Sequence, residues 1–269
     1  TKSNLETMKL ETLEEKLTFF GGAVVAWSIL FAFVNYNLEL PAKLGKRKID
    51  DLKNRVVSVV HGLFALCVSG YHIFRDNPTY AQQATTIQHI ILLTSCAYFF
   101  YDFLACVYYG LADMGLVIHH ATTLLGMISC EIANNATTGL LGLFMAEVSN
   151  FPMHFRAIIR TLKMRYTMLY EVAEGAYIFL YLIARGIGCT YLVITAIPVS
   201  ETPLLIRITC TGLWLQSLYF IYEMAGIIRR KVKQYKERCQ KGISYNWFND
   251  NPRLNELSYY KQEGNDKIF

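Results

Sequence analysis

The 269-residue sequence contains little charge, and long stretches of it contain almost none. Asp, Glu, Lys and Arg together make up 17% of the chain, whereas hydrophobic residues make up 53%. Uncharged stretches of roughly 20 residues recur, which is the length that a helix needs to cross about 30 Å of hydrocarbon. Each stretch is apolar around its whole circumference, which argues against a soluble bundle with one buried stripe per helix. The stretches are also too long to be the strands of a membrane barrel.

Two further absences narrow the class of protein. Cysteine is missing from the connections between the uncharged stretches. Of the seven cysteines, six lie inside those stretches and only Cys239 lies in a tail, so we expect no disulfide framework. A basic start is also missing, because the first 16 residues contain four Glu and three Lys. This composition fits neither a secretory signal nor a transit peptide, and we expect no cleavable leader.

We predict an all-α polytopic membrane protein with about seven transmembrane helices. The predicted spans are residues 18–35, 56–74, 87–109, 115–133, 138–158, 171–198 and 204–228. The predicted organisation has three parts. Residues 1–17 form an amphipathic segment on the membrane surface, residues 18–228 form the seven-helix domain, and residues 229–269 form a charged tail that contains aromatic residues.

Lys and Arg are nearly absent from alternate connections, which predicts the orientation in the membrane. Segments 36–55 and 156–170 and the tail from 229 onward contain 20 of them, and the opposite side contains four. Only an odd number of spans fits this alternation. The N-terminus is therefore predicted to lie outside and the C-terminus inside, which means the cytosol or the mitochondrial matrix. The net charge of +5 follows this topology, and we expect no nucleic-acid partner.

Polar side chains inside the predicted spans gather at or below the midplane, toward the inner face. Such groups are costly in the bilayer unless they face protein or a water-filled cavity. Either they bond to one another and hold the bundle together, or they line a cavity that binds a ligand or does chemistry. The predicted lipid-binding site or polar core consists of His61, Asp102, His119, His120, Thr123, Glu147, Asn150, Glu174 and Glu223.

Metal binding is the less favoured interpretation of the histidines. No helix carries the i, i+3 Glu/His pair of di-iron bundles. The adjacent His119 and His120 point about 100° apart on a helix, so only one easily faces a shared ligand. We predict no metal and no cofactor, and a bound phospholipid is the one small molecule expected. Near the outer ends of their spans, Glu131 and Arg207 are expected to pair.

Residues 118–160 contain a recognisable pattern. His119 and His120 are followed by Thr123, a turn then contains Asn135, Thr137 and Gly139, and the next span has an acidic residue near its middle. Together with the preceding span that carries Asp102, this pattern resembles the core motif of the TLC-domain family. That family includes the ceramide synthases and TRAM-type translocon proteins, and the resemblance covers about residues 50–230.

The resemblance implies a role for the two histidines but departs at the acidic positions. In ceramide synthases two histidines and two aspartates carry acyl transfer from acyl-CoA to a sphingoid amine. Here the aspartate positions are Glu147 and Asn150. Asn has no proton to give or take, so acid/base catalysis at that position is lost. The segment 147–152 is more similar to smaller TLC-domain-containing proteins, which are associated with membrane-lipid composition. If the chain is an enzyme, the candidate catalytic residues are His119, His120, Glu147 and Asp102.

The interpretation that we favour is a non-catalytic TLC-fold protein that binds membrane lipid and is a structural subunit of a larger membrane complex, for example a mitochondrial respiratory assembly. A lipid acyltransferase of the ceramide-synthase type and a free-standing regulator of membrane lipid composition stay open. Both tails are expected to contact neighbouring subunits. The mitochondrial inner membrane and the endoplasmic reticulum both stay open as locations. The tail aromatics suited to docking are Tyr235, Tyr245, Trp247, Phe248, Tyr259 and Tyr260.

Overall fold

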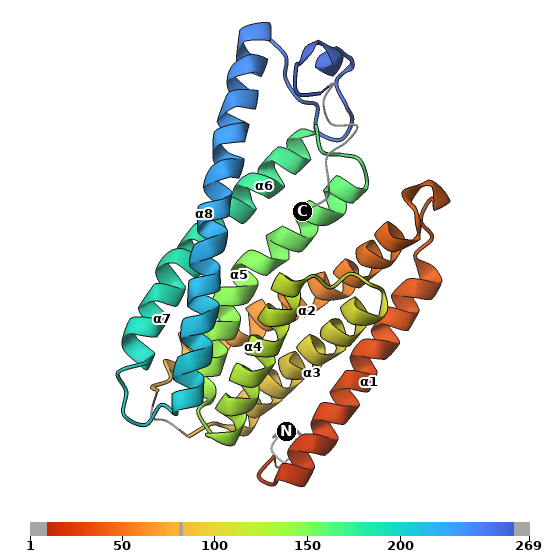
Figure 1. Cartoon of the computed structure of the whole chain (residues 1–269). Coiled ribbons are helices and arrows are strands. Elements are labelled where there is room, and N and C mark those ends of the chain that lie inside the picture. The colour runs from red at the N-terminus through yellow and green to blue at the C-terminus, as the bar shows by residue number, and fades with distance from the viewer. Residues whose placement is uncertain (1–9, 81–82, 261–269) are drawn as a thin grey trace.

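The structure is a computed structural model that describes residues 10–80 and 83–260. The described part of the chain is helical and has no strands, which confirms the all-α prediction. The helices form an elongated bundle with α1 along one edge and α7 and α8 along the other (Figure 1). The elements are α1 (Leu13–Asn37), α2 (Lys46–Asp76), α3 (Thr86–Tyr108), α4 (Met114–Ile132), α5 (Ala136–Thr161), α6 (Met168–Tyr181), the π-helical segment η3 (Leu182–Gly188), α7 (Cys189–Ala196) and α8 (Leu204–Lys241).

Within residues 10–80 and 83–260, six helices are long and apolar enough to cross a membrane, namely α1, α2, α3, α4, the continuous run Met168–Ala196 and α8. The remaining long helix, α5, has 26 residues but contains several polar side chains. It lies in the middle of the bundle, in contact with α2, α3, α4, α6 and α7 (Figure 1). A central helix can be more polar because its side chains meet protein instead of hydrocarbon. The prediction of a multi-pass membrane protein is therefore confirmed.

Several helices extend beyond the apolar stretches that predicted them. Helix α2 begins at Lys46 rather than at residue 56, and α8 continues to Lys241 rather than ending at residue 228. Helix α1 begins at Leu13, where the Thr12 side chain caps it by accepting a hydrogen bond from the Glu15 N–H. Residues 13–17 thus belong to α1 instead of a separate surface helix. Residues 1–9 of that predicted segment lie outside the described residues.

Helices α2 and α5 approach each other closely at two glycines. A Cβ atom on Gly62 would lie 3.1 Å from Glu147 Oε2, and one on Gly70 would lie 2.9 Å from the Phe144 ring. Small residues allow neighbouring membrane helices to pack at short range. The absence of a side chain at Gly62 therefore makes room for the buried Glu147 carboxylate.

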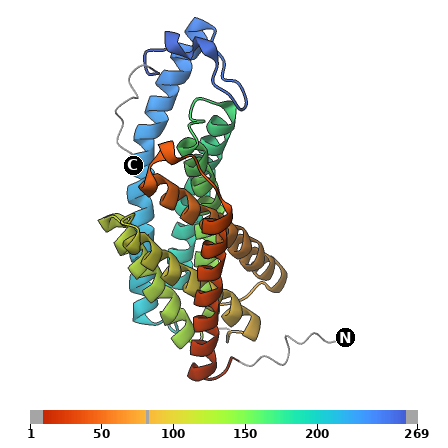
Figure 2. The ribbon, with the colours of Figure 1, turned by 90° about the vertical axis from the view of Figure 1, so that its right-hand side faces the viewer.

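The segment after α8 folds back onto the start of α6. The backbone N–H groups of Met168 and Leu169 donate to the carbonyls of Asn246 and Trp247, at 2.8 and 3.3 Å. Both views place this segment at the projecting end of α8 (Figures 1 and 2). Because the first N–H groups of a helix have no partner within it, this contact satisfies them.

The aromatic residues of the tail divide into two sets. Tyr245, Tyr259 and Tyr260 surround Tyr166, with ring centroids 4.8 to 6.3 Å from its own. Tyr235, Trp247 and Phe248 are exposed. Half of the aromatics expected to dock on a neighbour therefore pack against this chain instead, and the other half stays available for such a contact.

The predicted pair between Glu131 and Arg207 is wrong. Glu131 Oε2 lies 3.2 Å from Lys16 Nζ and 2.6 Å from His89 Nδ1, which joins α1, α3 and α4. The Arg207 guanidinium donates to the carbonyls of Thr202 and Val199, at 2.8 and 2.9 Å. Carbonyls beyond the end of α7 have no partner within a helix, so they compete successfully for the neighbouring arginine.

Candidate lipid-binding site

The polar residues predicted to form one layer are divided among several places in the bundle. Asp102 and His120 belong to a buried network that joins three helices. Asp102 Oδ2 lies 2.8 Å from His120 Nε2, and Asp102 Oδ1 accepts from Asn54 Nδ2 at 2.6 Å. Tyr101 donates to Asn54 Oδ1 at 3.0 Å. Every one of these side chains is buried and paired, as the low dielectric of an interior requires.

The His120 ring is fixed from both sides. Its Nδ1 lies 3.1 Å from the Leu116 carbonyl, which can only accept a hydrogen bond. Nδ1 therefore carries a proton, and a second proton lies between Nε2 and the Asp102 carboxyl group. His120 is consequently locked between α3 and α4.

His61 lies beside this network in an aromatic environment. Its ring is stacked on Tyr98, with centroids 3.7 Å apart, and the edges of Trp27 and Phe99 complete its surroundings. The residue is 1% exposed, and its Nε2 has no hydrogen-bond partner among the described residues. These contacts make His61 a packing residue between α1, α2 and α3.

Glu147 and Asn150 form a second network with an arginine. Asn150 Nδ2 donates to Glu147 Oε1 at 3.0 Å, and Asn150 Oδ1 accepts from Arg185 Nη2 at 3.3 Å. An amide can donate to a carboxylate through its nitrogen and accept from a guanidinium through its oxygen, whereas a carboxylate only accepts. An aspartate at position 150 would instead place a second carboxylate against Glu147. This position therefore suits an amide for structural reasons.

His119 points away from the Asp102 network. Its Nδ1 lies 3.1 Å from Gln216 Oε1, and Gln216 Nε2 donates to the Gly115 carbonyl at 3.3 Å. Because that carbonyl only accepts, the amide nitrogen of Gln216 must face Gly115 and its oxygen must face His119. His119 Nδ1 is therefore protonated, so when the ring is neutral the lone pair is on Nε2.

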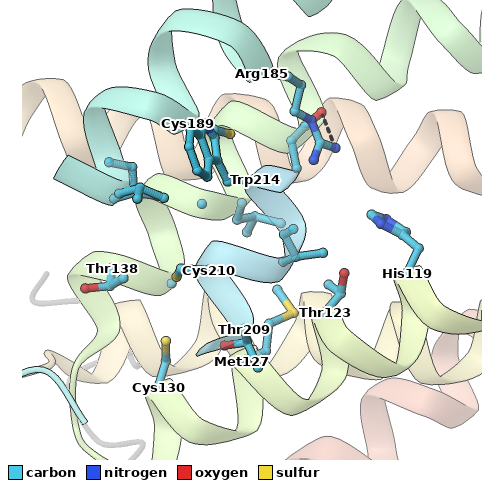
Figure 3. A pocket seen from close by; sticks show the side chains of 18 of the residues that line it. His119, Thr123, Met127, Cys130, Thr138, Arg185, Cys189, Thr209, Cys210 and Trp214 are labelled. Carbon is cyan, nitrogen blue, oxygen red and sulfur yellow. Dashed lines mark hydrogen bonds between the residues drawn. The ribbon is translucent and has the colours of Figure 1, made fainter. Parts of the chain in front are cut away.

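A cavity lies between α4, α5, α7 and α8, with about 740 Å³ of space not filled by protein, part of which is open to the surroundings of the bundle. His119, Thr123 and Arg185 lie on one side of it, and Cys130 and Thr138 lie on the opposite side (Figure 3). The walls between them are mainly apolar. They comprise Phe99, Gly126, Met127, Gly139, Gly142, Leu143, Ala146, Cys189, Leu192, Val193, Thr209, Cys210, Leu213 and Trp214.

Only two of the nine predicted site residues, His119 and Thr123, line this cavity. The sequence interpretation also omitted Arg185 from the site. A single arginine inside an otherwise apolar span often marks a functional site in a membrane protein, and this feature of the sequence could have identified Arg185. Asn54 was missed because α2 was predicted to begin only at residue 56.

Two predicted residues do not belong near the cavity. Glu174 accepts from Arg156 and Tyr170, both at 2.9 Å, and also pairs with Lys231 where α6 meets α8. Glu223 is exposed on α8, because the next residue, Met224, is the one that packs inward. Depth in the membrane was a poor guide here, because it does not show which way a side chain faces.

No three His, Cys, Asp or Glu side chains come together in residues 10–80 and 83–260 in an arrangement that would hold a metal ion.

A comparison with known protein families matches residues 51–229 to the TLC domain. The chain belongs to the TLC-domain family. The match includes every residue that lines the cavity, whereas α1 and the segment after α8 lie outside it. TLC-domain proteins form a membrane lipid-associated family, which directs attention to lipid as the occupant of the cavity.

Proposed function

We propose that this TLC-domain protein binds a lipid chain inside its helical bundle and does so without catalysing a reaction. The observation that carries the proposal is the cavity, whose long apolar walls end at three polar side chains, His119, Thr123 and Arg185. Ligand sites of this kind are largely apolar, with a few polar groups that fix orientation.

The carboxylates near the cavity support the non-catalytic part of the proposal. No carboxylate is among the lining residues. Asp102 is engaged by Asn54 and His120, and Glu147 is engaged by Asn150. General acid/base catalysis needs a titratable group within reach of the reacting atom, and these two are committed to packing.

Lipid binding is tested by comparing lipids that co-purify with the wild type and with Gly142→Phe. A Cβ atom on Gly142 meets only Leu192 within 4 Å, at 3.9 Å, so a larger side chain there enters the cavity. We expect native mass spectrometry to detect lipid on the wild type and much less on the variant. Gly175→Phe is the matched control, because Gly175 is exposed and a Cβ there meets nothing within 4 Å. Equal lipid on all three proteins would contradict the proposal.

The role as a structural subunit is a second part of the proposal. Its support is the exposed aromatic pair Trp247 and Phe248, which are 58% and 64% exposed at the far end of α8. Aromatic residues of this kind are enriched at protein interfaces. We expect the chain to co-purify from native membranes with other proteins at fixed stoichiometry, and the double variant Trp247→Ala, Phe248→Ala to lose them. Migration as a free monomer in mild detergent would argue for a free-standing regulator.

The location belongs to the same proposal. A mitochondrial inner-membrane assembly, including a respiratory one, and an endoplasmic-reticulum complex both fit the charge distribution. Fractionation of native cells, followed by identification of the co-purified proteins, decides between them.

Acyl transfer is the alternative function, and the orientation of His119 is the observation that favours it. His119 Nε2 carries a lone pair, and its ring lies at the cavity beside Thr123. Such a nitrogen can act as a general base. Acyl transfer from acyl-CoA by the purified protein, lost in His119→Ala and retained in Glu223→Gln, would replace the non-catalytic proposal.

A further inference from the structure

Arg185 is a buried cation that makes no direct ion pair among the described residues, and its guanidinium lies 5.8 Å from the centre of the Tyr181 ring. The residue is 6% exposed, and no carboxylate lies within 4 Å of its guanidinium among the described residues. Its hydrogen bonds go to neutral oxygens, those of Ser149, Asn150 and Ala146, at 3.3 to 3.5 Å. Glu147 reaches it only through Asn150. Arg156, by contrast, pairs directly with Glu174 at 2.9 Å.

Part of the Arg185 guanidinium is still available to bind a ligand. Nε and Nη2 make the hydrogen bonds just described, and Nη1 makes none within the described chain. Arg185 lines the cavity on the same side as His119 and Thr123 (Figure 3). A charge in the bilayer interior is costly and usually finds a partner, so an anionic ligand would complete this site.

Two further polar groups on that side lack partners. Thr123 Oγ1 is a buried atom with no hydrogen bond in the described part of the structure. His119 Nδ1 donates to Gln216, so in the neutral ring the lone pair is on Nε2, for which no hydrogen bond is formed within the described residues. A carboxyl group suits this combination, since its oxygens accept from the guanidinium and the hydroxyl. His119 then accepts the acid proton or, once protonated, donates to the carboxylate.

The backbone around Arg185 is unusual for a membrane helix. The seven residues of η3 form π-helical turns, which are rare and concentrate at functional sites. At the end of this segment Gly188 packs against α5, because a Cβ atom there would collide with the Met145 sulfur. In this segment Arg185 donates to Ser149 and Asn150 on α5 and lines the end of the cavity.

The rest of the cavity suits one hydrocarbon chain. His119 and Cys130 lie at its two ends and are 11 residues apart on α4, which is about 16 Å along the helix axis. The other side chains that line the cavity between these two ends are apolar or small. One polar end and one long apolar arm fit a lipid with a single chain and a compact head group.

We propose that the cavity binds a single-chain lipid with an anionic head group, such as a free fatty acid. The head group contacts Arg185, His119 and Thr123, and the chain extends toward Cys130 and Thr138. This inference rests on the proposed lipid-binding function and specifies the chemical class and orientation of the ligand.

The test compares lipids that share a chain and differ in the head group. Palmitate, palmitoyl lysophosphatidate and hexadecanol are titrated onto the delipidated full-length protein in nanodiscs. We expect an anionic lipid to bind about tenfold or more tighter than hexadecanol, because a hydrogen bond to a charged group is worth at least that factor. Preference for palmitate indicates a carboxylate head, and preference for the lysophosphatidate indicates a phosphate head. Either supports the proposal.

Substitutions separate the contribution of the Arg185 charge to lipid binding from the contribution of the apolar cavity. Arg185→Gln keeps an amide donor beside Ser149 and Asn150, and it should remove the preference for anionic lipid while leaving hexadecanol binding unchanged. Thr123→Val keeps the side-chain shape and should weaken anionic binding a few-fold without affecting folding, because the hydroxyl has no partner to lose. Arg207→Gln is the control, since its guanidinium binds loop carbonyls away from the cavity.

Orientation is tested with Gly142→Leu, which partly fills the cavity between its two ends. We expect it to weaken palmitate binding strongly and octanoate binding much less. Equal affinity of the wild type for palmitate, lysophosphatidate and hexadecanol would overturn the anionic head group but leave the lipid cavity standing. Failure of all three lipids to bind, together with unchanged co-purified lipid in Gly142→Phe, would overturn the proposed function itself.

Discussion

Asp102 offers a sharp test of whether the buried histidine network is held by charge or by complete hydrogen bonding. In Asp102→Asn the new amide oxygen can still accept from Asn54, and the amide nitrogen can donate to His120 Nε2. His120 would then be neutral, with Nδ1 still donating to Leu116 O. Every polar atom keeps a partner in this variant. In Asp102→Ala, Asn54 Nδ2 and His120 Nε2 both lose their oxygen acceptor inside the bundle.

The two variants should therefore differ greatly in stability. Removing one member of a buried pair costs about 3–5 kcal/mol, and replacing the pair by neutral groups that fit is often nearly neutral. Hydrogen bonds inside membranes are commonly weaker than expected, so we take about 3 kcal/mol for Asp102→Ala. At about 2–4 °C per kcal/mol for a domain of this size, that loss lowers Tm by about 6–12 °C. Asp102→Asn should lower Tm by no more than a few degrees.

The assay is thermal denaturation of each variant in the same detergent. Asp113→Asn is the matched control, because Asp113 is exposed and caps α4 by accepting from the Leu116 N–H, a role that Asn performs equally well. Equal destabilisation by Asp102→Asn and Asp102→Ala would refute the reasoning, since it would show that the charge of the pair, and not its hydrogen bonds, holds α3 and α4 together.

Two further predictions concern helix packing and the tail. Gly62→Ala should lower Tm, because the new Cβ would lie 3.1 Å from Glu147 Oε2. The control Gly175→Ala should leave Tm unchanged or raise it, because alanine has the higher helix propensity. Equal effects of the two substitutions on Tm would contradict the close packing of α2 against α5. On α8 beyond the apolar stretch, hydrogen bonds from Ser258 hold the pKa of Glu237 down at about 2, below its ordinary value of 4.5. A lowered pKa gives stability that is present above pH 4.5 and is lost as the pH falls toward 2. The protection of residues 242–260 against hydrogen exchange, relative to the intrinsic exchange rate at each pH, should therefore fall over that range. Glu237→Gln should show the lower protection already at neutral pH, and a protection factor independent of pH would contradict this contact.

The sequence predicted the class of protein and the family because both depend on local features. A run of about 20 apolar residues must be helical in lipid whatever surrounds it, so α1, α3 and α4 lie close to their predicted ranges. The His119-His120 pattern and the turn that follows identified the TLC domain, and the family match confirms it. The extensions of α2 back to Lys46 and of α8 on to Lys241 were missed, since charged residues beyond the membrane give no hydropathy signal.

The sequence also predicted that His119 and His120 diverge, because adjacent residues on a helix point about 100° apart. It did not determine which ring meets which partner. The structure places His120 against Asp102 on α3 and His119 against Gln216 on α8. That choice depends on the rotation of α4 relative to its neighbours, which no local pattern encodes.

The sequence by itself determined where each polar residue stands along its helix, because a helix rises about 1.5 Å per residue from a recognisable end. Only the tertiary structure decided which way those residues face. Glu223 and Glu174 share the depth of the cavity residues but lie elsewhere, whereas Arg185 reaches the cavity through a π-helical turn and a close glycine contact. The direction in which each side chain points depends on contacts between segments far apart in the chain, and those contacts form only when the bundle packs.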